Sequence, residues 1–285
     1  MTRAPRPPRE FTVRRIVVAA DASEHGRAAL EAAAMLGERL HAEVEGVFVE
    51  DINLVHLAEL PVGREVHLVS GHARAFDREL LESQLGAEAA EARRALRTLT
   101  ERARVRSSFR VVRGRVETEI IAAAGEGDLL VLGTFSRSIG TPRKAGSTAV
   151  AAAERAPRSV LLLRRGARIA GRPIAVHDGS EGAEIALEAA ARLAASAGET
   201  LTVLVIADTA ERADALQARI ADHLAARQVE PRFLRAPRLE LDELCRVSRR
   251  ADADVLVLDA DSPVLAGEAR GRLLEDVGCA ILLVR

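Results

Sequence analysis

The sequence predicts a tandem α/β protein whose two halves are each built from strands and helices that alternate around a parallel sheet. Short apolar runs alternate with stretches of helical period, which is typical of βαβ units. A stretch that begins at Asp21 returns at Asp178. The 285 residues are also enough for two domains, each able to bury a core of its own.

The first βαβ unit lies near the start of the chain. The apolar run at 16–20 is flanked by charge and predicts a buried parallel strand. Apolar residues at helical spacing follow over 28–40, with Ser23 as the expected N-cap, and 44–51 predicts a second strand. The crossover between two such strands is expected to be right-handed.

Residues 52–75 follow no clean period and predict a loop excursion with a short helical or hairpin piece. A long loop inside a compact domain is usually functional or mobile. The excursion contains His56, His67 and His72, but they are too scattered for a metal site, and no cysteine or carboxylate cluster supports one. We therefore interpret them as solvated loop histidines.

The remaining elements of the first half follow in regular order. We expect a long helix, a strand, a short helix, a strand, a helix and a fifth strand at 76–103, 105–113, 116–125, 128–132, 147–155 and 159–165. Pro157 should end the last helix, because proline has no N–H and breaks helical hydrogen bonding.

The second half repeats this pattern with deletions. The segment from Asp178 matches that from Asp21 at an offset of 157, Asp254-Val-Leu-Val-Leu matches Asp128-Leu-Leu-Val-Leu at 126, and 281–285 matches 160–164 at 121. The falling offsets place most of the missing residues in the excursion. A fixed internal repeat indicates tandem duplication. We expect a disordered tail at 1–12, a first domain at 13–165, a linker at 166–172 and a second domain at 173–285.

One loop of the first half has the features of a phosphate site. Gly133 follows the fourth strand, and Gly146, Ser147 and Thr148 stand where the next helix begins. Glycine lets the backbone approach a ligand closely, and the unpaired N–H groups at a helix N-terminus attract anions. The hydroxyls of Ser147 and Thr148 are expected at the helix cap.

With these residues in view, both halves resemble the universal stress protein family, whose doubly wound, Rossmann-like domains have five parallel strands in the order 3-2-1-4-5. The family's nucleotide motif is Gly, two residues, Gly, nine residues, Gly, then Ser or Thr. Gly133, Ser136, Gly146 and Ser147 occupy those positions, with Ser136 in place of the second glycine. The resemblance implies a cytoplasmic, bacterial-type regulatory protein that binds ATP or a related adenine nucleotide, with Mg²⁺ as its accompanying ion.

The resemblance also implies further pocket residues, namely Asp21 after the first strand and Val49 at the end of the second. The order 3-2-1-4-5 reverses between strands one and four, so Asp21 and Gly133 should flank the ligand crevice. Arg143 and Lys144, the only lysine of the chain, would neutralise phosphate charge. The alternative is that Gly133 is a plain turn residue and that Arg143 and Lys144 belong to a solvated loop.

In the second half, two carboxylates, Asp259 and Asp261, stand in place of Gly133 and Ser136 and would repel phosphate. We interpret this half as a pseudo-subunit that replaces the partner of a dimer. The halves are expected to meet through their fifth strands, or two chains associate as a homodimer.

Composition excludes several classes of function. The net charge is −1 and aromatic residues make up 2%, which argues against a nucleic-acid surface. No apolar run is long enough to span a bilayer, and residues 1–10 lack the apolar segment of a signal peptide. The two cysteines, Cys245 and Cys279, fit a reducing cytoplasm, and Cys279 is expected in the core.

Two alternatives to nucleotide-dependent regulation remain. A nucleotide-free scaffold would be recognised by a protein partner through its helices or the excursion, and the serine at position 136 favours it. A weak ATPase is least favoured, because no motif places a catalytic base or a metal-binding carboxylate. We name no catalytic and no metal-binding residues.

Overall fold

The computed structural model describes residues 11–21, 23–59, 64–66, 73–75, 78–134, 145–164, 167 and 169–285. The elements of the first half are β1 (Arg15–Ala19), α1 (Glu24–Leu40), β2 (Glu43–Asp51), α2 (Ile52–Glu59), β3 (Arg64–Val66), β4 (Ala73–Ala75), α3 (Arg78–Arg102), β5 (Ser107–Gly114), α4 (Val116–Glu126), β6 (Leu129–Gly133), α5 (Ser147–Arg155) and β7 (Ser159–Leu163).

The second half repeats the main elements of the first. It comprises β8 (Pro173–His177), α6 (Glu181–Ala197), β9 (Leu201–Ile206), α7 (Ala210–Ala225), β10 (Pro231–Ala236), α8 (Leu241–Arg250), β11 (Val255–Asp259), the 3-10 turn η1 (Pro263–Leu265), α9 (Ala269–Asp276) and β12 (Ala280–Val284).

A single ten-stranded sheet runs through both halves in the order β10-β9-β8-β11-β12-β7-β6-β1-β2-β5. Within each half the strands are parallel, and counted by position they have the expected order 3-2-1-4-5. The two fifth strands meet in the middle, where β12 pairs antiparallel with β7. The doubly wound fold and the contact through the fifth strands are therefore confirmed.

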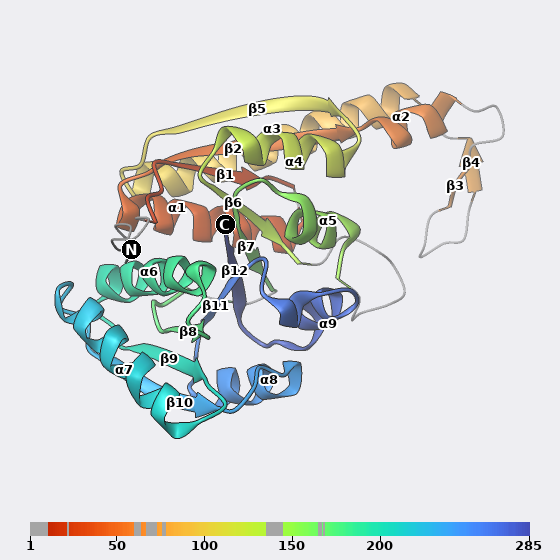
Figure 1. Ribbon diagram of the computed structural model, residues 1–285. Helices are drawn as coiled ribbons and strands as arrows, with labels where there is room; N and C mark the ends of the chain where they lie inside the picture. Colours follow the sequence, from red (N-terminus) through yellow and green to blue (C-terminus); the bar gives the residue numbers. More distant parts are fainter. Residues whose placement is uncertain are drawn as a thin grey trace, which may run out of the picture.

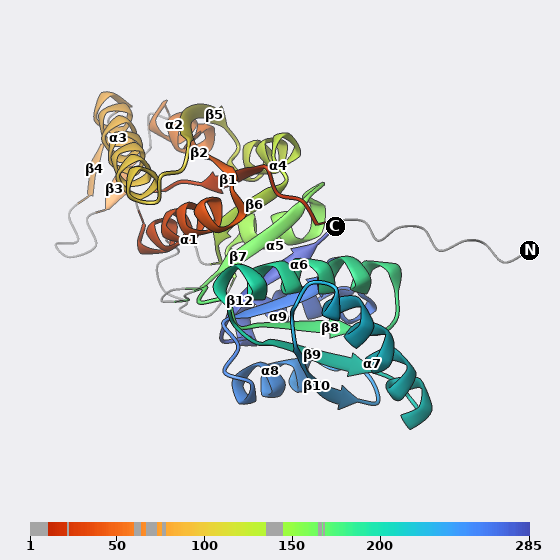
Figure 2. The ribbon, with the colours of Figure 1, turned by 90° about the vertical axis from the view of Figure 1, so that its left-hand side faces the viewer.

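Helices cover both faces of this sheet (Figures 1 and 2). One face packs against α1, α3, α6 and α7, and the other against α4, α5, α8 and α9. Because both faces are covered, the central strands are buried along their whole length, as in β7 and β12. This explains why they read as continuous apolar runs.

The core is built from small and branched aliphatic side chains, since the chain has no tryptophan or tyrosine. The two first helices of the halves, α1 and α6, bury alanines against the sheet, among them Ala33 and Ala190. Both helices begin at a serine, and Ser23 accepts a hydrogen bond from the Gly26 N–H at 3.0 Å, which confirms it as N-cap.

The excursion at 52–75 forms both of the structures that the sequence allowed, a short helix and a hairpin. It forms the helix α2 and the two-stranded hairpin of β3 and β4, which extend beyond the end of the sheet (Figure 1). His56 lies on α2 and is exposed, whereas His67 and His72 fall outside the described residues.

One correction concerns the start of the first half. Phe11 falls inside the predicted tail but is buried, with 7% of its surface exposed, and its carbonyl accepts a hydrogen bond from Arg192 of α6. Among the described residues the long helix spans Arg78–Arg102, within two residues of the expected 76–103. Within the described part of the chain, no helix has both the length and the apolar character needed to cross a membrane.

Candidate functional site

A cavity of about 310 Å³ opens above the carboxyl ends of β1, β2 and β6. The strand order reverses between β1 and β6, which is where open α/β sheets form ligand crevices. Five of the predicted site residues line this cavity, namely Asp21, Val49, Gly133, Gly146 and Thr148. Residues more than a hundred positions apart are thus brought to one place.

The loop between β6 and α5 is closed at its base by backbone hydrogen bonds. The Gly146 N–H donates to the Thr134 carbonyl at 2.8 Å, and the Thr134 N–H donates to the Leu163 carbonyl at 2.8 Å. These bonds fix the end of β6 beside the start of α5. The intervening Ser136, Arg143 and Lys144 lie outside the described residues, so their roles stay predictions.

The cap of α5 differs from the expectation. Gly146 is the N-cap, and no described side chain forms a capping hydrogen bond there. Ser147 is the first helical residue and is exposed, while Thr148 lines the cavity. Among the described residues no side chain caps the first N–H groups of the helix, and such groups attract anions.

Asp21 is held at the cavity by its own loop. Its Oδ1 accepts hydrogen bonds from the Ser23 N–H at 2.9 Å and from the Ser23 hydroxyl at 2.5 Å. The carboxylate lies over the first turn of α1, because a Cβ added at Gly26 would stand 2.0 Å from Asp21 Oδ1. Gly26 therefore leaves room for the aspartate.

The greater part of the cavity lining is apolar and was missed by sequence reasoning. Its further members include Phe48, Leu54, Leu85, Val116, Ile120 and Leu132. They come from β2, α2, α3, α4 and β6, so only the tertiary fold unites them. Asp51 and Glu88 add two carboxylates to that of Asp21. In the described part of the chain, no three His, Cys, Asp or Glu residues are grouped to hold a metal.

The corresponding place in the second half is nearly filled. A cavity of about 10 Å³ lies between residues of β8, α6 and β11, among them Asp178, Ser180 and Asp259. Asp259 stands at the strand end that Gly133 occupies in the first half, and its Oδ2 would lie 2.1 Å from a Cβ at Gly182. Counted at the offset of 126, Ser262 rather than Asp261 matches Ser136, which corrects the predicted pairing.

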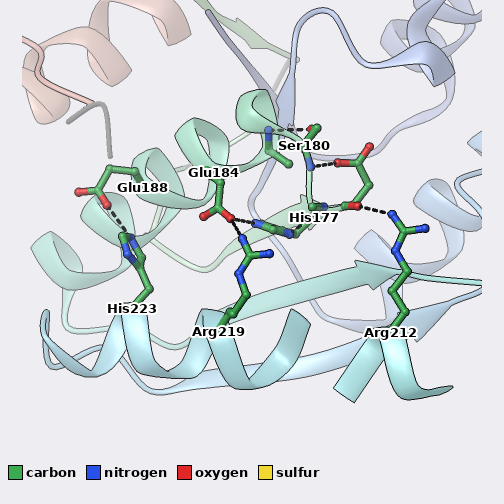
Figure 3. Close-up of polar contacts among 10 residues, drawn as sticks. His177, Ser180, Glu184, Glu188, Arg212, Arg219 and His223 are labelled. Carbon is green, nitrogen blue, oxygen red and sulfur yellow. Dashed lines mark hydrogen bonds and ion pairs between the residues drawn. The ribbon is translucent and has the colours of Figure 1, made fainter. Parts of the chain in front are cut away.

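A polar cluster around His177 joins β8, α6 and α7 (Figure 3). His177 stands where the first half has Ala20, and its buried ring accepts a hydrogen bond at Nδ1 from the Gly179 N–H. Its Nε2 lies 3.4 Å from the carboxylate of Glu184, which Arg219 of α7 also contacts at 2.5 Å. The contact with His177 and the charge of Arg219 lower the pKa of Glu184 against the opposing effect of burial.

Glu188, one turn further along α6, has partners of the same kind. It is buried, with 8% of its surface exposed, and contacts His223 at 3.2 Å (Figure 3). Arg227 contacts the same carboxylate at 2.8 Å. The pairs join α6 to α7. This half uses these side chains for structural ion pairs.

Comparison with protein families matches residues 12–164 to the universal stress protein family. Among solved structures, a universal stress protein from Archaeoglobus fulgidus DSM 4304 is similar to the chain with a TM-score of 0.71 and 15% identity, over 95% of this chain and 98% of that one. A functionally unknown protein from Pseudomonas aeruginosa PAO1 is similar with a TM-score of 0.60 and 17% identity, over 96% and 93%.

At these identities the solved structures show the fold alone, and no curated protein matches the sequence. The two solved structures nevertheless cover both halves of the chain, whereas the family match covers only the first half. The second half retains the strand order of the first while its cavity has closed. On its family match, its motif spacing and its strand order, the chain belongs to the universal stress protein family.

Proposed function

We propose that the first half binds ATP or a related adenine nucleotide in the cytoplasm, and that the second half is a pseudo-subunit without a nucleotide of its own. Occupancy of the cavity would alter a surface that a protein partner recognises. The observation that carries this proposal is the single cavity that joins Asp21, Val49, Gly133, Gly146 and Thr148.

The described residues fit such a ligand. Gly133 leaves open the space that Asp259 fills in the other half, and the uncapped start of α5 offers N–H groups to phosphate. The apolar lining suits a purine ring, and about 310 Å³ falls at the lower end of the range of small-molecule sites. The carboxylates of Asp21, Asp51 and Glu88 would disfavour a bare polyphosphate, so Mg²⁺ is expected to strengthen the binding of ATP.

Calorimetry with ATP, AMP and cyclic AMP, each with and without Mg²⁺, tests the proposal. Gly133→Asp copies the second half into the first and should abolish the heat of binding. Gly86→Asp is the matched control, because Gly86 is exposed on α3, is not itself a lining residue of the cavity, and has nothing within 4 Å of an added Cβ. Thermal unfolding of both variants shows whether they remain folded.

Absence of binding heat and of a thermal shift with millimolar nucleotide would contradict the proposal and leave the nucleotide-free scaffold. Equal binding of nucleotide by Gly133→Asp and the natural chain would show that the nucleotide binds outside this cavity. Slow ATP turnover that Gly146→Asp removes would instead support the enzymatic alternative.

A further inference from the structure

The helix α2 and the start of α3 have no counterpart in the second half. There β9 leads to α7 through only residues 207–209, and α7 has 16 residues. In the first half α2 and the hairpin stand between β2 and α3, which has 25 residues. The strand order is otherwise the same, so this insertion is the main architectural difference between the open and the filled cavity.

The insertion supplies one side of the cavity. Leu54 of α2 and Leu85 of α3 line it, and α3 packs on the sheet face opposite to α4. From α4, Val116 and Ile120 line the other side. Aliphatic side chains from α2, α3 and α4 thus bound the cavity, an arrangement that suits a flat apolar ring.

Leu54 is the unusual member of this set. It keeps 40% of its surface exposed, whereas Leu85 keeps 7%. A large aliphatic side chain beside an open cavity has apolar surface that a ligand can remove from water. Leu57, one turn later on the same helix, is 45% exposed and does not line the cavity.

We infer that α2 determines specificity by placing Leu54, which lines the same cavity as Val116 and Ile120, against the purine ring of the nucleotide. The inference rests on the proposed function and deepens it. The phosphate end of the cavity, at Gly133 and Gly146, fixes one end of the ligand, so the apolar end receives the ring. The insertion then selects nucleotides over sugar phosphates that carry no ring.

The test compares Leu54→Ala with its matched control Leu57→Ala, using AMP and ribose 5-phosphate in calorimetry. Loss of the leucine contact should weaken AMP binding about 4- to 15-fold, the range expected for burying about one or two fewer methylene groups against the ligand. Ribose 5-phosphate should bind both variants and the natural chain alike, and Leu57→Ala should bind AMP normally.

The two possible failures are distinguishable. If the natural chain binds AMP and Leu54→Ala binds it equally well, the inference is overturned while the proposed function stands. If the natural chain binds neither ligand, the proposed function fails. Titration with ANS, a dye that binds apolar surface, then tests whether Leu54 forms part of an apolar binding site. Weaker dye binding in Leu54→Ala than in Leu57→Ala supports an apolar ring site there, and equal binding overturns it.

Discussion

Arg164 and Arg285 occupy equivalent positions after the two fifth strands, and each binds the last helix of the opposite half. Arg164 donates to the carbonyls of Glu275 and Val277 at the end of α9, the first at 2.9 Å. Arg285 donates to the carbonyls of Ala153 and Glu154 near the end of α5, the first at 2.6 Å. The contacts are reciprocal, as at a two-fold interface between subunits.

Removing one of these arginines should loosen the joint between the halves. Arg285→Ala loses charged hydrogen bonds to helix carbonyls and is expected to cost about 1–3 kcal/mol of unfolding free energy. Chemical denaturation followed by circular dichroism measures the change. Arg97→Ala, on an exposed pair with Glu101, should cost less than about 1 kcal/mol, and an equal loss in both would refute the role of Arg285.

The acid stability of the second half should depend on Glu184. Its pKa is lowered by His177 and Arg219, so the folded state binds its proton less readily than the unfolded state does. The stabilisation is therefore present above about pH 4.5, the usual value, and is lost as the pH falls through the lowered folded-state pKa. Glu184→Gln should lower the melting temperature at pH 7 and converge with the natural chain in acid.

Glu181→Gln provides the control for this pH series. Glu181 is exposed on the first turn of the same helix, and the described structure shows no ion pair for it. Its melting temperature should follow that of the natural chain at every pH. A constant difference between Glu184→Gln and the natural chain from pH 7 to pH 3 would show that the carboxylate charge is not responsible.

Both thiols should be unreactive in the folded protein. Cys279 is buried, and this burial raises its pKa to about 11. Burial also raises the pKa of Cys245. At pH 7 a thiol with a pKa of about 11 is ionised in only about one molecule in 10⁴, so Ellman's reagent should react slowly until denaturant exposes both cysteines. Rapid reaction of either thiol under native conditions would contradict the buried assignment.

Two glycines should respond to alanine with opposite signs. A Cβ at Gly46 of β2 would stand 2.7 Å from both Leu96 and Phe109, so Gly46→Ala should destabilise the fold by about 1–3 kcal/mol. Gly86 lies within α3 with open space around it, so Gly86→Ala should stabilise by about 0.5–1 kcal/mol. Urea denaturation of the two variants measures the changes in unfolding free energy. Equal changes would contradict the argument that the space around the added Cβ sets their sign.

The fold was accessible from the sequence because its signals are local and occur twice. Buried runs such as 128–132 mark strands by themselves, and the match of Asp178 to Asp21 fixes the duplication. The strand ends at Asp21 and Gly133 are brought together by topology alone, so these site residues could be predicted. Val49 was predicted from the family resemblance, and it lines the same cavity.

The other residues of the site are brought together by tertiary contacts, which the hydrophobic periodicity of the sequence does not predict. Leu54 belongs to an aperiodic excursion, and Leu85 lies on a helix whose orientation is fixed only by packing against the sheet. The cap of α5 was misplaced because serine has the higher N-cap propensity, while the chain turns one residue earlier at Gly146. Ser136 lies outside the described residues, so its substitution for glycine stays untested.

Because β7 pairs antiparallel with β12, the strands of the two halves run in opposite directions, and their carboxyl ends lie on opposite sides of the sheet. The open cavity at the carboxyl ends of the first set of strands and the filled one at those of the second set therefore lie on opposite sides. Two identical subunits joined this way would offer two equal sites, and ligand binding at one could assist binding at the other. Under the proposed function a single chain offers one nucleotide site, and one site titrates with a Hill coefficient of one, so the signal of a monomer would be graded with ligand concentration rather than switched over a narrow range.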